Sequence, residues 1–369
     1  MSKNDLLIIA KYLTLFGLSR KLRTGLVEAL LPFDRLRANG VGLSPMMKNS
    51  IVAAGLIFSA FGATLPLHAA DTWPVRPIRM IVAYPPGGGT DQVGRVMAER
   101  LSEHLGQNVV VDNRGGATGN IGTELAARAA PDGYTLLMGN VAPNAVNVSL
   151  FKKLGFDPVQ DFAPVSLVAV TPNILVAHPS VPVKTVRELV ALAKAKPGAL
   201  NFPSAGVGSS SHLAGELLKS LTKIDMVHVP FKGGGPALVA MISGEVQIMF
   251  ATLPAAMPHV KSARARPIAV TTAKRSPAMP ELPTIAEAGV AGYEASTWYG
   301  LLAPARTPQP VVNRLHGETV KILAGPTRQR LEVQGFEPIG GTPAEFSAYI
   351  KSEIVKWAKV IKDANIPAE

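Results

Sequence analysis

The stretch Ile78–Asp91, IRMIVAYPPGGGTD, decides the fold. Its first six residues, Ile78–Ala83, form a continuous apolar run with β-branched side chains, which predicts a strand covered on both faces. Three glycines follow, and from Asp91 apolar residues recur at helical spacing as far as Leu105, just before Gly106. A buried strand, a glycine loop and an amphipathic helix in this order indicate an α/β fold.

The alternation of strands and helices continues along the chain. Strands predicted over 108–111 and 134–138 flank a helix over 120–130, so the chain from Ile78 onward is predicted to form a βαβαβ unit with a parallel sheet. A second series of strands and helices begins near Pro172. Two helices, expected over 309–323 and 343–363, end the chain and should pack back on the first series, because alone they bury too little surface.

Residues 46–70 have the layout of a secretory signal peptide. A short basic segment at Lys48 precedes the apolar run Ile51–Leu65, and small residues end the segment at Ala69 or Ala70. Cleavage after one of these two alanines predicts an exported protein. An uncleaved membrane anchor is the alternative, because the apolar run approaches the ~20 residues that span a bilayer. A signal peptide starts at its short basic segment and does not need residues 1–45 before it. We therefore interpret these residues as a non-native upstream extension.

Composition excludes several classes of protein. The chain has 369 residues and no cysteine, which excludes disulfides, iron–sulfur clusters and a cysteine nucleophile. The formal net charge is +11, and without residues 1–70, which hold eight basic and three acidic residues, it is +6. The basic residues are scattered, so no nucleic-acid partner is predicted. The isolated histidines have no metal-ligand spacing, so neither a metal nor a cofactor is expected.

Four glycine-rich loops, at 84–91, 113–122, 203–212 and 228–236, each join a strand to a helix. Backbone N–H groups at a glycine turn and at a helix start can hold a carboxylate or phosphate without an arginine. The first loop lacks the Gly-Lys-Ser/Thr of a P-loop, and Gln92 stands where a dinucleotide fingerprint needs Gly or Ala. Alternatively, this loop binds no ligand and is a simple turn in which Thr90 or Asp91 caps the helix.

The third loop also permits an enzymatic hypothesis. Ser209 or Ser210 beside His212 would make the chain an exported serine hydrolase. The Gly-x-Ser-x-Gly pattern of a nucleophile elbow fails around Ser210, however, because His212 occupies the last position.

An ordered series of motifs then resembles one family. The motifs are WPxRPI at 73–78, YPPGGGTD at 84–91, NRGGATGNIG at 113–122, PDGYTLL at 131–137, HVPFKGGGP at 228–236, AVTT at 269–272, PTIAEAG at 283–289 and WYGL at 298–301. This series, which covers essentially all of 73–369, resembles the Bug/TctC proteins, the extracytoplasmic solute-binding receptors of tripartite tricarboxylate transporters.

The resemblance implies an α/β, two-lobe periplasmic binding fold of type 2-like, Venus flytrap form, with parallel-rich sheets flanked by helices. Lobe 1 would be 71–172 and 297–369, and lobe 2 would be 173–296. It implies a periplasmic monomer that captures a small carboxylated metabolite by hinge closure, for inner-membrane permease subunits; a permease-free sensory binder is the alternative. The ligand-binding residues it implies are Tyr84, Gly88, Gly89, Thr90, Asp91, Gly119, Asn140, Asn144, Ser204, Gly208, Ser209 and His212.

Two residues depart from the pattern of the family. Ala251 follows the strand ending at Phe250, where Asp is usual, and Gln247 stands where Asp is common. The absence of a carboxylate near the cleft between the lobes would weaken recognition of an ammonium group on the ligand. A plain carboxylate is therefore the expected ligand in preference to an amino acid.

Overall fold

The computed structural model describes residues 73–363 and 366–368. The predicted upstream extension and signal peptide, with the cleavage site near Ala69 or Ala70, lie outside these residues. Within the described ranges, no helix combines the length and the apolar character that crossing a bilayer requires.

The strands are β1 (Ile78–Val82), β2 (Val109–Asn113), β3 (Thr135–Asn140), β4 (Phe162–Ala177), β5 (Asn201–Ser204), β6 (Val227–Pro230), β7 (Ile248–Thr252), β8 (Arg266–Val270), β9 (Ser296–Pro304) and β10 (Glu337–Pro338). The helices are α5 (Gly89–Leu105), α6 (Asn120–Ala127), α7 (Asn147–Leu150), α8 (Val186–Ala195), α9 (Ser210–Thr222), α10 (Gly234–Ile242), α11 (Leu253–Lys261), α12 (Gln309–Ala324), α13 (Thr327–Val333) and α14 (Pro343–Asp363), with short irregular turns at Ala117–Gly119 and Ala142–Val146.

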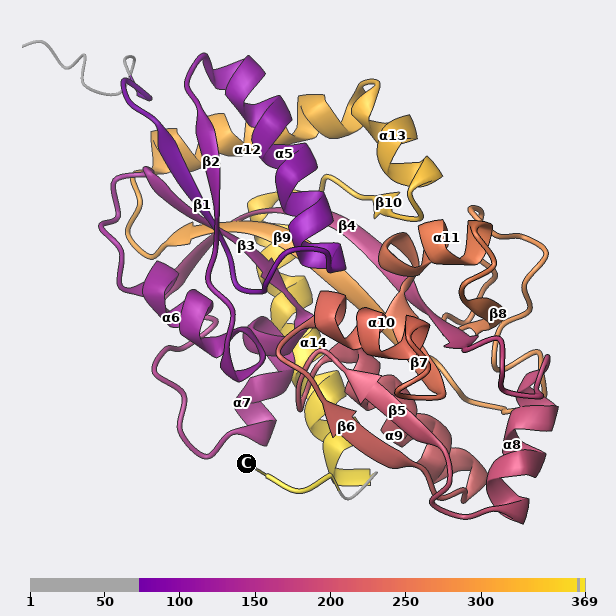
Figure 1. Ribbon diagram of the computed structural model, residues 1–369. Helices are drawn as coiled ribbons and strands as arrows, with labels where there is room; N and C mark the ends of the chain where they lie inside the picture. Colours follow the sequence, from indigo (N-terminus) through magenta and orange to yellow (C-terminus); the bar gives the residue numbers. More distant parts are fainter. Residues whose placement is uncertain (1–72, 364–365, 369) are drawn as a thin grey trace, which may run out of the picture. The chain divides into compact units, whose positions relative to one another are not determined.

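The predicted βαβαβ unit is confirmed. Strand β1 pairs in parallel with β2 on one side and with β3 on the other, and α5 and α6 supply the crossovers (Figure 1). Successive side chains of β1 point to opposite faces. Met80 and Val82 share a buried cluster with residues of α5 and α12, whereas Ile81 shares one with residues of α6 and α14. Both faces of this sheet are therefore covered, as the apolar run of β1 requires.

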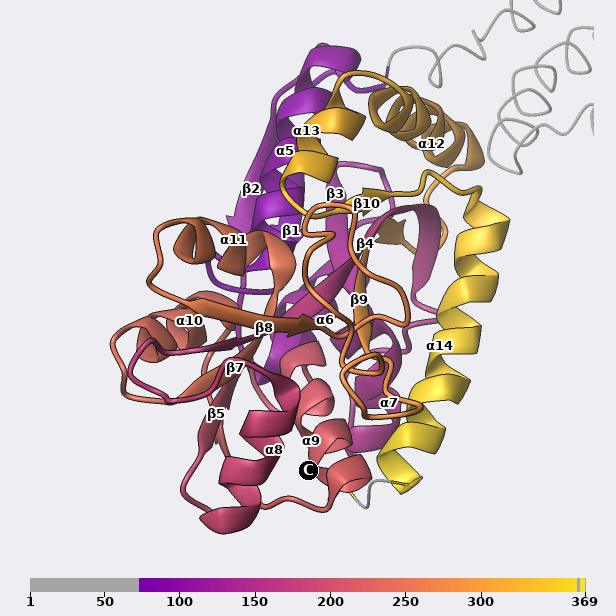
Figure 2. The same ribbon diagram turned by 90° about the vertical axis from the view of Figure 1, so that its right-hand side faces the viewer.

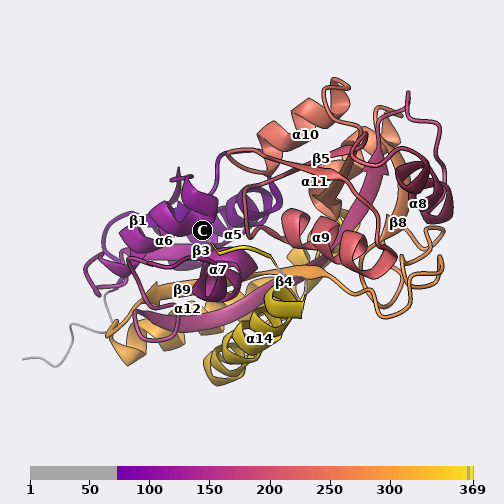
Figure 3. The same ribbon diagram turned by 90° about the horizontal axis from the view of Figure 1, so that it is seen from below.

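Strand β4 joins the two halves of the fold. Its residues from Phe162 to Pro172 pair antiparallel with β9, and its residues from Asn173 to Ala177 pair antiparallel with β7 and β8. Figure 3 shows β1, β3, α6 and α7 at one end of the view and β5, α8, α9 and α10 at the other, with β4 between them. We call the part with β1–β3 and β9 the first lobe and the part with β5–β8 the second lobe.

The fold class is confirmed as a two-lobe α/β fold. Parallel pairing occurs in β2–β1–β3 and in β5–β6, and the long strands β4 and β9 add antiparallel pairs, so the larger sheet is mixed. The residue boundaries of the two lobes stay a prediction.

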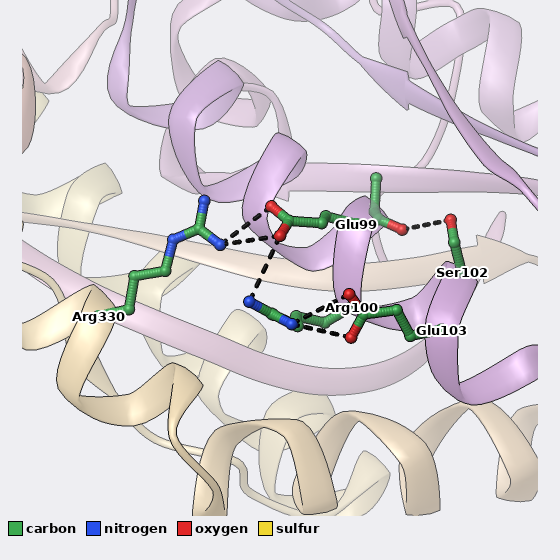
Figure 4. A network of polar contacts seen from close by, with 6 residues as sticks. Glu99, Arg100, Ser102, Glu103 and Arg330 are labelled. Atoms are coloured by element: carbon green, nitrogen blue, oxygen red, sulfur yellow. Dashed lines mark hydrogen bonds and ion pairs between the residues drawn. The ribbon is translucent and has the colours of Figure 1, made fainter.

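The C-terminal helices lie against the first lobe. Helix α14 packs on β4 (Figure 2). The buried carboxylate of Glu353 accepts hydrogen bonds from the indole N–H groups of Trp298, at 3.2 Å, and Trp357, at 2.9 Å. Helix α13 is tied to α5 at the surface, where Arg330 pairs with Glu99 at 2.9 Å and Glu99 also meets Arg100 at 3.3 Å (Figure 4). Exposed pairs of this kind contribute only about 0–1 kcal/mol each, so apolar packing holds these helices.

Candidate binding site

A small cavity of about 50 Å³ lies between the two lobes. Within the described residues, none of those that line it carries a charge. The lining residues are Tyr84, Gly88, Gly89, Thr90, Asn140, Val141, Ala142, Ala205, Ser209, Ser210, Ser211, Gly234, Met249, Phe250, Ala251, Thr252, Ala255, Thr297 and Tyr299. The polar groups available to a ligand are therefore hydroxyls, an amide and backbone N–H groups.

Four helices begin at this cavity: α5, α9, α10 and α11. The first turns of α5, α10 and α11 have no side-chain cap, because Gly88 and Gly233 have no side chain and the Thr252 side chain makes no capping bond. The first N–H groups of a helix have no partner within the helix, and the helix dipole places partial positive charge there. Convergence of four such ends makes the cavity favourable for an anion although it contains no cation.

The first-lobe wall is held by a short polar network. Asn140 donates from Nδ2 to the Thr90 hydroxyl at 3.0 Å, and its Oδ1 accepts the N–H of Ala142 at 3.1 Å. The Tyr84 hydroxyl donates to the carbonyl of Thr118 at 3.0 Å. Burial raises the pKa of Tyr84, so its phenol stays protonated. These bonds fix the side chains that face the start of α5.

Asp91 supports the first glycine loop from behind. Its carboxylate accepts the N–H of Gly87 at 3.1 Å and Nδ2 of Asn113 at 2.9 Å, and it pairs with Arg95 at 3.0 Å. Burial acts to raise its pKa, but the bonds from Arg95, Asn113 and Gly87 outweigh burial and hold that pKa below its usual range. The carboxylate does not line the cavity. Asp91 therefore shapes the loop that a ligand would meet.

In the second lobe, serine hydroxyls bind the loop that precedes α9. Ser209 caps α9 by accepting the N–H of His212 at 3.4 Å, and its hydroxyl lies 3.0 Å from that of Ser211. Ser211 in turn accepts the N–H of Ala205 at 3.0 Å. The loop is thereby closed on the first turn of α9, with Ser209, Ser210 and Ser211 at the cavity wall.

Two stacked histidines, His212, which is buried, and His228, which is half-buried, lie behind this wall. The rings of His212 and His228 have centroids 4.1 Å apart, and Nε2 of His228 lies 2.6 Å from the Ser204 hydroxyl. Burial, assisted by the neighbouring His228 and Lys219, lowers the pKa of His212 to about 3. Burial and Lys219 lower the pKa of His228 to about 4. Both rings are therefore neutral at neutral pH.

The serine hydrolase hypothesis is wrong for the residues it named. Nδ1 of His212 accepts the N–H of Gly208 at 3.1 Å, and the ring makes no hydrogen bond to Ser209 or Ser210 among the described residues. A base with a pKa of about 3 is also too weak to take a serine proton near neutral pH. His212 is a neutral structural residue behind the wall.

Glycine loops of the two lobes touch directly. A Cβ on Gly235 would lie 2.6 Å from the carbonyl oxygen of Pro86, and one on Gly233 would lie 2.5 Å from Cγ of Pro85. At a second contact between the lobes, a Cβ on Gly206 would lie 2.6 Å from the Thr118 hydroxyl. Any side chain at these glycines would hold the lobes apart, so their absence permits this close approach.

The structure brings half of the predicted site residues to the cavity. Six line it: Tyr84, Gly88, Gly89, Thr90, Asn140 and Ser209. Gly119 lines a neighbouring groove that shares Tyr84. Five lie behind the walls: Asp91, Asn144, Ser204, Gly208 and His212, of which all but Asn144 make hydrogen bonds there. Asn144 is fully buried, and its side chain lies against Gly139.

Sequence reasoning missed the lining residues of β7, α11 and β9. Tyr299 lies in the WYGL motif and Gly234 in the fourth glycine loop, so both had a signal, but neither was assigned to the site. Met249, Phe250 and Thr252 had none, because a buried strand looks the same whether or not its end faces a ligand; Ala251 had one only as a departure from the family pattern. Ala251 is one of these lining residues, whereas Gln247 lies apart and accepts the N–H of Asn201 at 2.9 Å.

Comparison with known proteins identifies the family of the chain. The family model "Tripartite tricarboxylate transporter family receptor", TctC, matches residues 93–366. Protein BugT of Bordetella pertussis (strain Tohama I) is 37% identical over 321 residues, which are 86% of this chain and 98% of BugT.

Solved structures are similar over most of the chain. R. palustris Rpa4515 with adipate is 39% identical with a TM-score of 0.79, and the match covers 80% of this chain and 100% of that one. MatC (Rpa3494) from Rhodopseudomonas palustris with bound malate is 34% identical with a TM-score of 0.75, covering 78% and 100%. The periplasmic binding protein BugD is 34% identical with a TM-score of 0.78, covering 80% and 100%.

The fold and the site therefore define a solute-binding receptor of the periplasmic binding protein class, not an enzyme. Within that class, the chain belongs to the TctC family of tripartite tricarboxylate transporter receptors.

Proposed function

We propose that this chain is a periplasmic receptor that binds a small, plain carboxylate between its lobes and presents it to permease subunits of a tripartite tricarboxylate-type transporter. The observation that carries the proposal is the convergence of four helix starts on a cavity whose lining, over residues 73–363, includes no charged side chain. Relatives with adipate and with malate support the class of ligand.

The neutral lining favours a plain carboxylate over an amino acid. An ammonium group would meet the positive ends of helices and no carboxylate, because the lining residue next to Phe250 is Ala251. The cavity is small and most of its lining residues are buried, so these interactions act at lower effective dielectric than in bulk water. A carboxylate is stabilised by the same field that repels the ammonium group.

Closure of the lobes around the ligand would occur at the segments that connect them. Thr271 binds two of these segments, since its hydroxyl donates to the carbonyl oxygen of Asn173 or of Ala295 and accepts the N–H of Asn173 at 2.9 Å. A cavity of about 50 Å³ behind touching glycine loops leaves no wide path for entry. We therefore expect an open form that admits ligand and a closed form that a permease recognises.

Native mass spectrometry of protein purified from its own host tests the proposal. A retained intact carboxylate is expected, and adipate or malate should raise the melting temperature by mass action. Turnover of esters, or the absence of any shift across a panel of carboxylates, would contradict the proposal. Co-purification with membrane subunits would separate a transport receptor from a permease-free sensory binder.

A further inference from the structure

Tyr299 carries a polar group in the cavity that the protein itself does not satisfy. Its side chain is 1% exposed and its hydroxyl has no hydrogen-bond partner among the described residues, although the Thr252 and Thr297 hydroxyls lie nearby. Leaving a buried hydroxyl unpaired is costly, so a missing partner needs an explanation.

The fold directs this hydroxyl at the start of α5. Tyr299 lies on β9 directly opposite Asn140 of β3, and its ring packs edge-on against Phe336 with centroids 5.6 Å apart. A Cβ on Gly89, the first residue of α5, would overlap the Tyr299 hydroxyl. The hydroxyl therefore occupies the space above Gly89, where α5 has no capping side chain.

We propose that the Tyr299 hydroxyl donates a hydrogen bond to the ligand carboxylate that binds at the start of α5, and that it helps select an anionic ligand. This inference rests on the proposed function. Burial raises the pKa of Tyr299, so the phenol stays protonated and available as a donor across physiological pH. Gly89 supplies the space that brings the donor and the uncapped helix end to one point.

Tyr299→Phe tests the inference because it removes one oxygen and keeps the ring. The probe is whichever of adipate, malate and a panel of other mono-, di- and tricarboxylates gives the largest thermal shift with the wild-type protein. We expect calorimetry to show affinity for that probe lowered about tenfold or more, as for loss of a bond to a charged group. The melting temperature of the unliganded variant should stay equal to that of the wild type or rise.

Tyr293→Phe is the matched control. Tyr293 is also buried, but its hydroxyl donates to the carbonyl of Ala214 at 2.8 Å and it does not line the cavity. This control should lower the melting temperature and leave the affinity unchanged.

The two ways of failing are distinguishable. If the wild type binds the probe and Tyr299→Phe binds it within twofold, the inference fails and the proposed function stands. A melting temperature of unliganded Tyr299→Phe lowered as far as that of Tyr293→Phe would also overturn it, because the hydroxyl would then be bonded within the protein. If the wild type binds no carboxylate, both fail.

Discussion

Gly235 of α10 lies against the carbonyl of Pro86, so closely that a Cβ at residue 235 would be 2.6 Å from that oxygen. The two residues belong to different lobes and to the glycine loops on either side of the cavity. Neither can move away from the other without separating the lobes. This contact offers a direct way to test closure.

Gly235→Ala should weaken ligand binding by preventing full closure. Overpacking of this kind costs about 1–3 kcal/mol, and the cost falls on the closed form alone, so affinity for the carboxylate should fall about tenfold. Gly317→Ala, in α12 with nothing within 4 Å of the added Cβ, should bind as the wild type does. Isothermal titration calorimetry measures both, and equal affinities for the two variants would contradict closure at this contact.

Ala251→Asp should alter the preference for ligand charge. A carboxylate in the cavity lining repels a plain carboxylate and can pair with an ammonium group. We expect affinity for the carboxylate that the wild type binds to fall more than tenfold, and the affinity for its amino-bearing analogue relative to that carboxylate to rise. Ala251→Asn, which has nearly the same shape without the charge, is the control. A ratio that is the same in both variants would show that charge at residue 251 does not select the ligand.

The histidine pair predicts a loss of stability in mild acid. In the folded protein the pKa of His212 is about 3 and that of His228 is about 4, both below the ordinary 6.5, so unfolding takes up protons between these values. The contribution of the two neutral histidines to the free energy of unfolding is complete above pH 6.5. It is lost as the pH falls toward 4, by at most about 1.4 kcal/mol per histidine per pH unit.

Urea unfolding at pH 7.0, 5.5 and 4.5 measures this dependence. The free energy of unfolding should fall over this range in the wild type and fall less in His212→Gln/His228→Gln. If the free energy of unfolding of the wild type stays constant or increases as the pH is lowered, the two histidines are not held neutral in the folded protein.

Asp91→Asn should destabilise the protein more than it weakens binding. The change weakens the pairing with Arg95 and the bond from Gly87, so we expect the free energy of unfolding to fall by about 1–3 kcal/mol. Affinity should fall less than tenfold, since the carboxylate does not line the cavity. Asp112→Asn, in a more exposed pairing with Arg79 and Arg114, should cost about 0–1 kcal/mol. A large loss of affinity with full stability would make Asp91 a ligand contact.

Local patterns predicted much of the fold. The apolar run of β1 and the glycine loop before α5 are where the sequence places them, because covered strands and helix starts have strong local signals. Thr185 caps α8, as a threonine three residues before a glutamate favours, with the Glu188 N–H donating to the Thr185 hydroxyl at 3.1 Å. The length of β4 was not predictable, because its two parts pair with different partners and its proline residues interrupt the strand pattern.

The site was predictable only in its loops. A glycine loop before a helix predicts an anion site from backbone chemistry alone, and Gly88 and Gly89 line the cavity. Side chains such as Tyr299 and Thr252 reach the cavity through long-range strand pairing, which a local pattern does not contain. For the same reason, the sequence placed His212 and Ser204 in the third glycine loop, but it could not show that their side chains lie behind the cavity wall.

Calorimetry with matched ligand pairs tests the central claim most directly. Malate and aspartate differ in one substituent, a hydroxyl or an ammonium group, and adipate and 2-aminoadipate differ by one ammonium group. A cavity built from helix starts with no charged side chain should bind at least one plain carboxylate and bind its ammonium-bearing partner at least tenfold more weakly. Tight binding of the amino acids with no affinity for the plain carboxylates would contradict it.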